Sequence, residues 1–238
     1  MTQLHLLAKR DLSLAQYLKA TCSQHEVWAG IIEPNGSEQS IYDRYLFAFL
    51  SINTAFPPNC EAFERMRGRY WTDAEETEHA IRLTPSVAFA PTKAKDIAAF
   101  TKRYLANPRM FRRRVAETPA ALRDRLNIQG LGQAKLSFAL ALTCPTTSNV
   151  VCLDRHVQRW ATGRNRNGLS PRLYARIETA LVKVGQRYGV SAFVAQWCIW
   201  DWMRGHEEDH VAIADKEGVP DETEQASRLV RTYSVQRR

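Results

Sequence analysis

Apolar residues recur at helical spacing along most of the chain. Side chains three and four positions apart repeat in successive segments, which predicts amphipathic helices. Only residues 27–40 leave a short strand or a loop open, because no convincing alternation of apolar and polar residues is present elsewhere. The predicted helices span residues 42–56, 59–71, 72–83, 92–107, 118–126, 133–143, 154–162, 170–188 and 191–205. The pattern therefore predicts an all-α fold.

Turn and capping residues mark where several of these helices begin. Thr72 is the expected cap of one helix, and proline stands in the first turn of the helix at 118–126. We expect two helical lobes with a cleft between them. The terminal lobe would combine residues 1–41 with 165–215, and the middle lobe would span 42–164. The remaining segment, 216–238, is polar and has a composition that allows disorder.

Composition narrows the class of protein. The chain has 238 residues, of which 45% are hydrophobic and 24% charged, as is ordinary for a globular protein. It has no apolar run of membrane-spanning length and no recognisable secretory signal, so we expect a cytoplasmic protein with no membrane partner. The five cysteines lie far apart without C-x-x-C spacing, which predicts reduced thiols and no zinc or iron–sulfur site.

Two local features bear on metal and charge. His206, Glu207, Asp209 and His210 could bind a metal, but they run into an acidic segment, so we expect neither a metal nor another cofactor. The net charge is +8, and residues 93–125 hold ten lysines and arginines against three acids. This basic segment favours an acidic partner such as nucleic acid, although a solvated helical face explains the charge equally well.

A glycine hairpin follows the basic segment. The sequence "LRDRLNIQGLGQAKLSFALAL" predicts a helix, a tight turn and a second helix. Gly130 and Gly132 permit unusual backbone conformations and close approach by a ligand. The N–H groups at the start of the second helix could hold a phosphate, with Lys135 adding charge. The alternative is a corner in which the glycines serve geometry alone.

The hairpin and "VVCLDRHVQRW" (150–160) together resemble the helix-hairpin-helix (HhH-GPD) DNA glycosylase superfamily. The match covers residues 128–160, and the archaeal 8-oxoguanine type and some phage-associated relatives are the most similar in pattern. A weaker match at 45–66 resembles the helix and wedge loop that precede the hairpin in these enzymes. The resemblance implies a helix-hairpin-helix at about 118–143 and a monomer that acts on duplex DNA with a damaged or modified base. It also implies a bacterial or phage-encoded intracellular protein. It also implies DNA binding through Gly130, Leu131, Gly132, Gln133 and Lys135.

Asp154 corresponds to the catalytic aspartate of this superfamily. Cleavage of an N-glycosidic bond develops positive charge on the sugar, which a nearby carboxylate stabilises. The alternative is that Asp154 only caps the helix that follows it. The family's lyase lysine falls at position 134, which is Ala134 here, and Lys135 lies one residue later, about 100° further around the helix. Lys135 is therefore a candidate for phosphate contact, for nucleophilic catalysis or for a surface charge.

The base pocket and the wedge have weaker candidates. The loop "SINTAFPPN" could fill the space left by an extruded base. Its Asn53 could contact the orphaned partner base or the extruded base, although asparagine beside a Pro-Pro turn is often only a cap. Trp197 and Trp200 could stack on a base while Asp201 reads its edge, or these residues could belong to the core.

These observations predict a DNA glycosylase that releases an altered base with the help of Asp154. Two alternatives remain open. One is an enzyme of phage-type DNA base hypermodification on the same scaffold, and the other is a DNA-binding protein that kept the hairpin without the chemistry.

Overall fold

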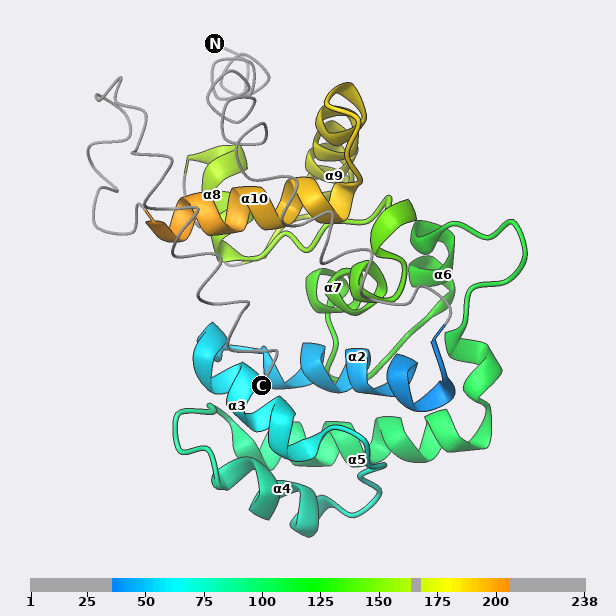
Figure 1. Ribbon diagram of the computed structural model, residues 1–238, viewed down its shortest axis with the longest axis vertical. Helices are drawn as coiled ribbons and strands as arrows, with labels where there is room; N and C mark the ends of the chain where they lie inside the picture. The colour runs from blue at the N-terminus through cyan, green and yellow to red at the C-terminus, as the bar shows by residue number, and fades with distance from the viewer. Residues whose placement is uncertain (1–35, 164–167, 206–238) are drawn as a thin grey trace. The chain divides into compact units, whose positions relative to one another are not determined.

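The computed structural model describes residues 36–163 and 168–205, and every regular element within these ranges is helical (Figure 1). The predicted all-α fold is confirmed. None of the described helices is both long and apolar enough to cross a lipid bilayer. The segment 216–238 and the residues His206, Glu207, Asp209 and His210 lie outside the described ranges.

The described residues divide into two compact units at the bond between Cys152 and Leu153. Residues 36–152 form the middle unit, and residues 153–163 with 168–205 form the terminal unit. The sequence pattern placed the boundary after residue 164 instead. The structure differs because the helix that follows Asp154 packs on the last described helix of the terminal unit.

Six α-helices and two 3-10 turns build the middle unit. They are α2 (Glu38–Leu50), α3 (Phe56–Met66), α4 (Ala74–Arg82), α5 (Ala90–Ala106), η1 (Pro108–Phe111), α6 (Pro119–Arg125), α7 (Gln133–Thr143) and η2 (Pro145–Thr147). Neighbouring helices pack in the order α2 on α3, α5 and α7, α4 on α5, and α6 on α7 (Figure 1).

Local capping chemistry explains where several helices begin. Ser37 accepts a hydrogen bond from the Ser40 amide, so α2 begins four residues before the predicted start at 42. Asp73 accepts from the Glu76 amide at 2.9 Å and caps α4, so the prediction of Thr72 as the cap is wrong. A carboxylate at the cap also interacts favourably with the helix dipole. Thr118 caps α6 as its position before proline suggests.

An aromatic cluster between α2 and α5 forms the core of the middle unit. Tyr42, Tyr45, Phe100, Tyr104 and Phe111 are all nearly inaccessible to solvent, and their ring centroids lie 5.2 to 5.9 Å apart in the contacting pairs. The buried hydroxyls have partners: Tyr42 pairs with Thr101 at 2.8 Å, and Tyr104 donates to the Glu38 carbonyl at 2.7 Å. Each buried ring contributes on the order of 2 kcal/mol to stability, so this cluster fixes α5 beneath α2.

A half-buried ion pair fixes the arginine-rich segment before α6. Arg125 donates to Glu117 through Nε at 2.8 Å and through Nη2 at 2.9 Å, and also to the carbonyls of Met110 and Arg112. Glu117 additionally accepts from the Arg114 amide at 2.9 Å. Arg125 lowers the pKa of Glu117 to about 2, and the Arg114 amide adds to the effect. One guanidinium thus ties the loop after η1 to α6.

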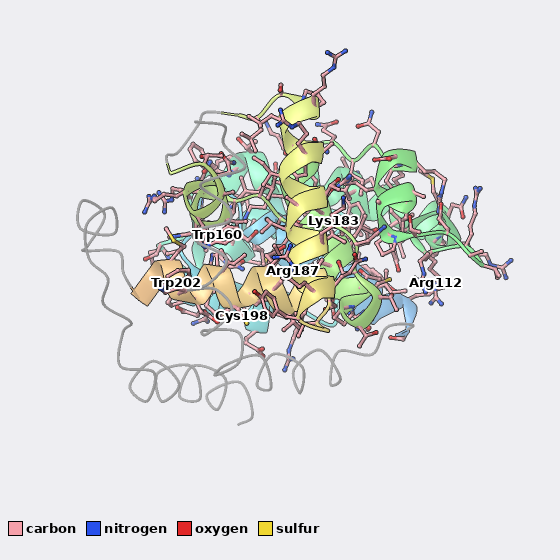
Figure 2. All side chains as sticks on the ribbon, turned by 90° about the horizontal axis from the view of Figure 1, so that it is seen from above. Arg112, Trp160, Lys183, Arg187, Cys198 and Trp202 are labelled. Carbon is pink, nitrogen blue, oxygen red and sulfur yellow. The ribbon has the colours of Figure 1, made fainter. Side chains whose placement is uncertain are left out.

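Three helices form the terminal unit: α8 (Arg155–Thr162), α9 (Pro171–Arg187) and α10 (Ala192–Gly205). Ser170 caps α9, and Pro171 occupies its first turn. Both α8 and α9 pack on α10, and Figure 2 shows α9 crossing α10, with Lys183 and Arg187 labelled along α9. The Tyr174 hydroxyl accepts from the Leu153 amide at 3.4 Å. The buried side chains Val157, Trp160, Phe193 and Trp197 supply the core.

The Glu117–Arg125 pair predicts a specific pH dependence of stability. Because the folded pKa of Glu117 lies below its usual value, the carboxylate stabilises the fold above about pH 4.5, and this contribution is lost as the pH falls toward about 2. Glu117→Gln should lower the free energy of unfolding at neutral pH by roughly 1–3 kcal/mol. Urea unfolding should show this difference shrinking as the pH falls.

The exposed Glu75 in the first turn of α4 provides the control. Glu75→Gln should change the free energy of unfolding by less than about 0.5 kcal/mol at any pH in this range. A Glu117→Gln deficit that stays constant between pH 7 and acid would contradict the role assigned to the Glu117 charge.

Candidate functional site

The segment between α6 and α7 forms the predicted hairpin. Its turn closes with a hydrogen bond of 3.1 Å from the Leu131 amide to the Ile128 carbonyl, and the Leu131 side chain is buried. Gly130 and Gly132 flank this residue and are exposed. The predicted helix-turn-helix at 118–143 is therefore present, with a leucine anchoring a turn whose glycines face outward.

Gly130 is required by the fold itself. Its φ of 82° belongs to the left-handed region, which side chains disfavour. A Cβ atom at this position would also lie closer than 3.0 Å to the carboxylate of Asp96 on α5. The same carboxylate accepts a hydrogen bond of 3.0 Å from Nε2 of Gln129. Asp96 thus holds the hairpin through Gln129 and leaves no room for a side chain at position 130.

Gly132 has no comparable structural reason. Its φ of −66° and ψ of 168° are open to any residue, and a Cβ would meet no atom within 4 Å. Gly132 is the N-cap of α7 and offers no side-chain acceptor to the first turn. Among the described residues, no hydrogen bond is made by the amides of Gln133, Ala134 or Lys135. The start of α7 therefore presents backbone N–H groups without acceptors in the described ranges, next to open space at Gly132.

Lys135 lies in this first turn and is half-buried. Its ammonium stands 5.5 Å from the ring centroid of Phe138, one turn further along α7. Ala134 occupies the preceding position, where the related glycosylase pattern has its lysine. The side chain of Lys135 is thus held by a cation–π contact beside the hairpin.

Lys93 on α5 is a polar residue that the sequence pattern did not single out. It is 2% exposed and donates to the Leu50 carbonyl at 2.8 Å and to Thr54 Oγ1 at 2.6 Å. Burial, and to a smaller extent the charge of Lys135, lowers the pKa of Lys93 to about 8. The available signal was its spacing: Lys93 precedes the buried Ile97 by four residues and Phe100 by seven, so it falls on the apolar face of the helix.

Asn53 lies in the loop between α2 and α3 and is exposed. Its φ of 49° places it in the left-handed region, which is uncommon for a residue other than glycine. Thr54, the next residue, is bound by Lys93. Phe47, near the end of α2, contacts Phe138 on α7 at a ring-centroid distance of 5.7 Å. The structure therefore brings the Asn53 loop and the hairpin to the same part of the middle unit.

Asp154 is the N-cap of α8 in the terminal unit. Its Oδ1 accepts from the His156 amide at 3.0 Å and from the Val157 amide at 2.9 Å. Both bonds end on one oxygen, and no hydrogen bond to Oδ2 is found in the described part of the chain. The start of α8 thus orients the carboxylate through Oδ1, and Oδ2 can accept a hydrogen bond from another group.

An aromatic chain adjoins this cap. The His156 ring contacts Trp200 edge-on with a centroid distance of 6.0 Å, and Trp200 contacts Trp197 at 5.2 Å. Trp197 is buried, while Trp200 and the next residue, Asp201, are half-buried. The structure thus connects Asp154 to the tryptophans through His156, to which the sequence pattern gave no role. Trp197 lies in the core, whereas Trp200 and Asp201 are partly accessible.

No group of three or more His, Cys, Asp or Glu side chains suited to a metal ion occurs within residues 36–163 and 168–205. The four residues weighed as metal ligands, His206, Glu207, Asp209 and His210, fall beyond this range.

The effect of the Lys135 charge on the pKa of Lys93 predicts that the titrations of these two lysines are linked. Lys135→Met should raise the pKa of Lys93 above its value of about 8, because one of the two causes that lower it is removed. Side-chain amine NMR between about pH 6 and about pH 11 measures the midpoint. Lys95→Met, on the exposed side of α5, should leave it unchanged. Identical midpoints in the wild type and Lys135→Met would show that the two charges do not interact.

The sequence and the fold were compared with those of known proteins. No protein-family model matches the chain, and no curated protein was found to be similar in sequence. Solved structures do match. The 8-oxoguanine DNA glycosylase of Thermotoga maritima superposes with a TM-score of 0.68 at 21% identity, covering 86% of this chain and 98% of the other.

Two structures of the enzyme from Methanocaldococcus jannaschii agree with this. The 8-oxoguanine DNA glycosylase has a TM-score of 0.66 at 18% identity, over 86% of this chain and 98% of the other. The glycosylase/lyase bound to a 15mer DNA containing 8-oxoguanine has a TM-score of 0.68 at 19% identity, over 81% and 97%. The chain therefore has the all-helical, helix-hairpin-helix fold of the 8-oxoguanine DNA glycosylases.

Proposed function

We propose that this protein is a DNA glycosylase-like enzyme that cleaves the N-glycosidic bond of a damaged or modified base flipped out of duplex DNA. The observation that carries the proposal is a fold shared over almost the full length of three glycosylase structures. The cap geometry of Asp154 and the open hairpin at Gly132 agree with it.

Asp154 is assigned as the carboxylate that assists the reaction. When the bond between C1′ and the base nitrogen breaks, positive charge develops on the sugar, and the anion stabilises it. Water then adds at C1′, and the base departs with a proton. The two amide bonds to Oδ1 hold the carboxylate in one orientation, which leaves Oδ2 to face the sugar or the water. Capping and catalysis are therefore compatible roles of one side chain.

A hydrolytic reaction without strand cleavage fits the lysine register. Imine formation requires an unprotonated amine aimed at C1′. Position 134 carries a methyl group, and Lys135, the next residue, is held over Phe138. One of the similar structures is a glycosylase/lyase, and the lyase activity of that protein is not assigned to this chain. Borohydride trapping on a DNA with a cleavable base should give no covalent adduct.

The hairpin is assigned to the DNA backbone. A phosphate placed before α7 would receive hydrogen bonds from the first-turn amides and would be attracted by Lys135. The missing side chain at Gly132 lets the phosphate approach the main chain closely. Such contacts fix the position of the duplex without reading its sequence.

Asp154→Asn separates catalysis from capping. Asparagine is as good an N-cap as aspartate and keeps the acceptor for His156 and Val157, so the melting temperature should change little. Base release should fall by at least about a hundredfold, because the negative charge is lost. Mass spectrometry of bases released from a panel of damaged and phage-modified duplexes, starting with 8-oxoguanine, measures the rate.

Asp154→Ala is the matched comparison, because it removes both the charge and the cap. It should lose base release equally and should also cost about 1 kcal/mol of stability. If Asp154→Asn released bases at the wild-type rate, Asp154 would be only a cap. If the wild type released no base from any duplex in the panel, the glycosylase assignment itself would be wrong.

The two hairpin glycines predict opposite outcomes. Gly132→Ala should fold as stably as the wild type but weaken duplex binding by about tenfold or more, since the methyl group occupies the space of the phosphate. Gly130→Ala should instead lower the free energy of unfolding by roughly 1–2 kcal/mol, because its φ is positive and Asp96 leaves no room.

Thermal melting and fluorescence anisotropy at constant salt distinguish these effects. Equal duplex affinity for Gly132→Ala and the wild type would show that no ligand approaches the main chain at this position.

A further inference from the structure

A lysine ammonium lies almost wholly inside the middle unit. Lys93 is 2% exposed, and its acceptors are a carbonyl and a hydroxyl rather than a carboxylate. Burying a charge is costly unless its hydrogen bonds are well satisfied. Met would fill a similar volume on this apolar face of α5 without that cost. The role of the Lys93 charge therefore follows from the structural roles of its two acceptors, the Leu50 carbonyl and Thr54 Oγ1.

The first acceptor ends α2. The last four carbonyls of an α-helix have no partner within the helix. In α2, the Ser51 amide binds the Phe47 carbonyl at 3.1 Å, the Ser51 hydroxyl binds Ala48 at 2.7 Å, and the Ile52 amide binds Phe49 at 3.3 Å. The ammonium of Lys93 binds the remaining one, Leu50, at 2.8 Å. A cation at this end also interacts favourably with the helix dipole.

The second acceptor fixes the loop that leaves α2. Thr54 Oγ1 accepts from Lys93 at 2.6 Å and donates to the Ile52 carbonyl at 3.1 Å. These bonds hold the residues on both sides of Asn53. A left-handed backbone costs on the order of 1 kcal/mol for a residue other than glycine and persists where its surroundings determine it. The bonds from Lys93 supply that constraint at Asn53, whose φ is 49°.

The same helix supports the hairpin. Asp96, one turn after Lys93 on α5, accepts from Gln129 and lies directly beneath Gly130. Two side chains one turn apart thus hold the two exposed segments of the middle unit that were expected to meet DNA. Phe47, in the last turn of α2, contacts Phe138 on α7 at a ring-centroid distance of 5.7 Å, which places the beginning of α7 near the end of α2.

We propose that Lys93 is a positioning residue that holds the exposed loop around Asn53 in the conformation in which this loop enters the DNA duplex at the site of the extruded base. The inference rests on the function proposed above. Lys93 itself touches no DNA, since it is covered by the loop and by α2.

Lys93→Met tests this by separating duplex binding from entry of the loop. A duplex with a tetrahydrofuran abasic analogue opposite 2-aminopurine reports entry, because the fluorescence rises when the 2-aminopurine loses its stacking. Anisotropy on an unmodified duplex reports binding at the hairpin. Lys93→Met should keep the affinity for the unmodified duplex within about threefold of the wild type. The 2-aminopurine signal at saturating protein should fall at least about fivefold.

Lys95→Met is the control, since Lys95 lies on the exposed side of the same helix. It should retain the full fluorescence signal. A wild-type signal in Lys93→Met would overturn the proposal, and so would a covalent adduct trapped at Lys93 by borohydride, which would make it a nucleophile. A signal lost in step with the affinity for unmodified DNA would also overturn it, because the defect would then be general.

Thr54→Val covers the case in which Lys93→Met fails to fold. Valine is nearly isosteric and removes only the acceptor and the bond to Ile52. The 2-aminopurine signal should fall at least about twofold with unchanged duplex affinity. An unchanged signal would contradict the proposal. Failure of the proposed function has a different signature, because the wild type would then bind no duplex or release no base.

Discussion

The buried ammonium of Lys93 is the interaction on which the exposed part of the middle unit depends. It completes the end of α2 and fixes Thr54, so the aromatic core that holds α2 on α5 also determines the path of the Asn53 loop. One turn along α5, Asp96 does the same for the hairpin. Polar loops are normally free to vary, and here two side chains on one rigid helix remove that freedom.

In the proposed reaction, one carboxylate, Asp154, serves both structure and chemistry. The start of α8 supplies two amides that orient the group. Both amides bind Oδ1. Because the carboxylate is planar and rigid, these bonds also fix the position of Oδ2. Preorganisation of this kind is what a developing cation requires, because no reorganisation is needed as the charge forms. His156 donates its backbone amide to this cap and contacts the half-buried Trp200 with its ring, so one residue connects the cap to the aromatic side chains of α10.

How far the sequence predicts this structure depends on whether the determinant is local. The bounds of α7 at Gln133–Thr143 match the prediction because a glycine turn and a change of composition mark them, and α9 follows its Ser-Pro start. The start of α2 was missed because Ser37 is followed by polar residues that do not show the apolar period. Lys93 was counted as part of a basic surface, since a charge sum does not reveal which side of a helix a residue occupies. The left-handed φ of Asn53 stands beside Thr54, which is bound by Lys93, a residue 39 positions further along the sequence from Thr54.

The hairpin separates the demands of the fold from those of a ligand. Gly130 and Gly132 are indistinguishable in the motif, yet only Gly130 has a positive φ and a neighbour that excludes a side chain. Gly132 has an ordinary backbone and empty space around it, so the folded chain alone gives no reason for a glycine there. A residue that the fold does not constrain, at a helix start with unused amides, is best explained by what binds to it. The glycine that stability does not require is therefore the more informative of the two about function.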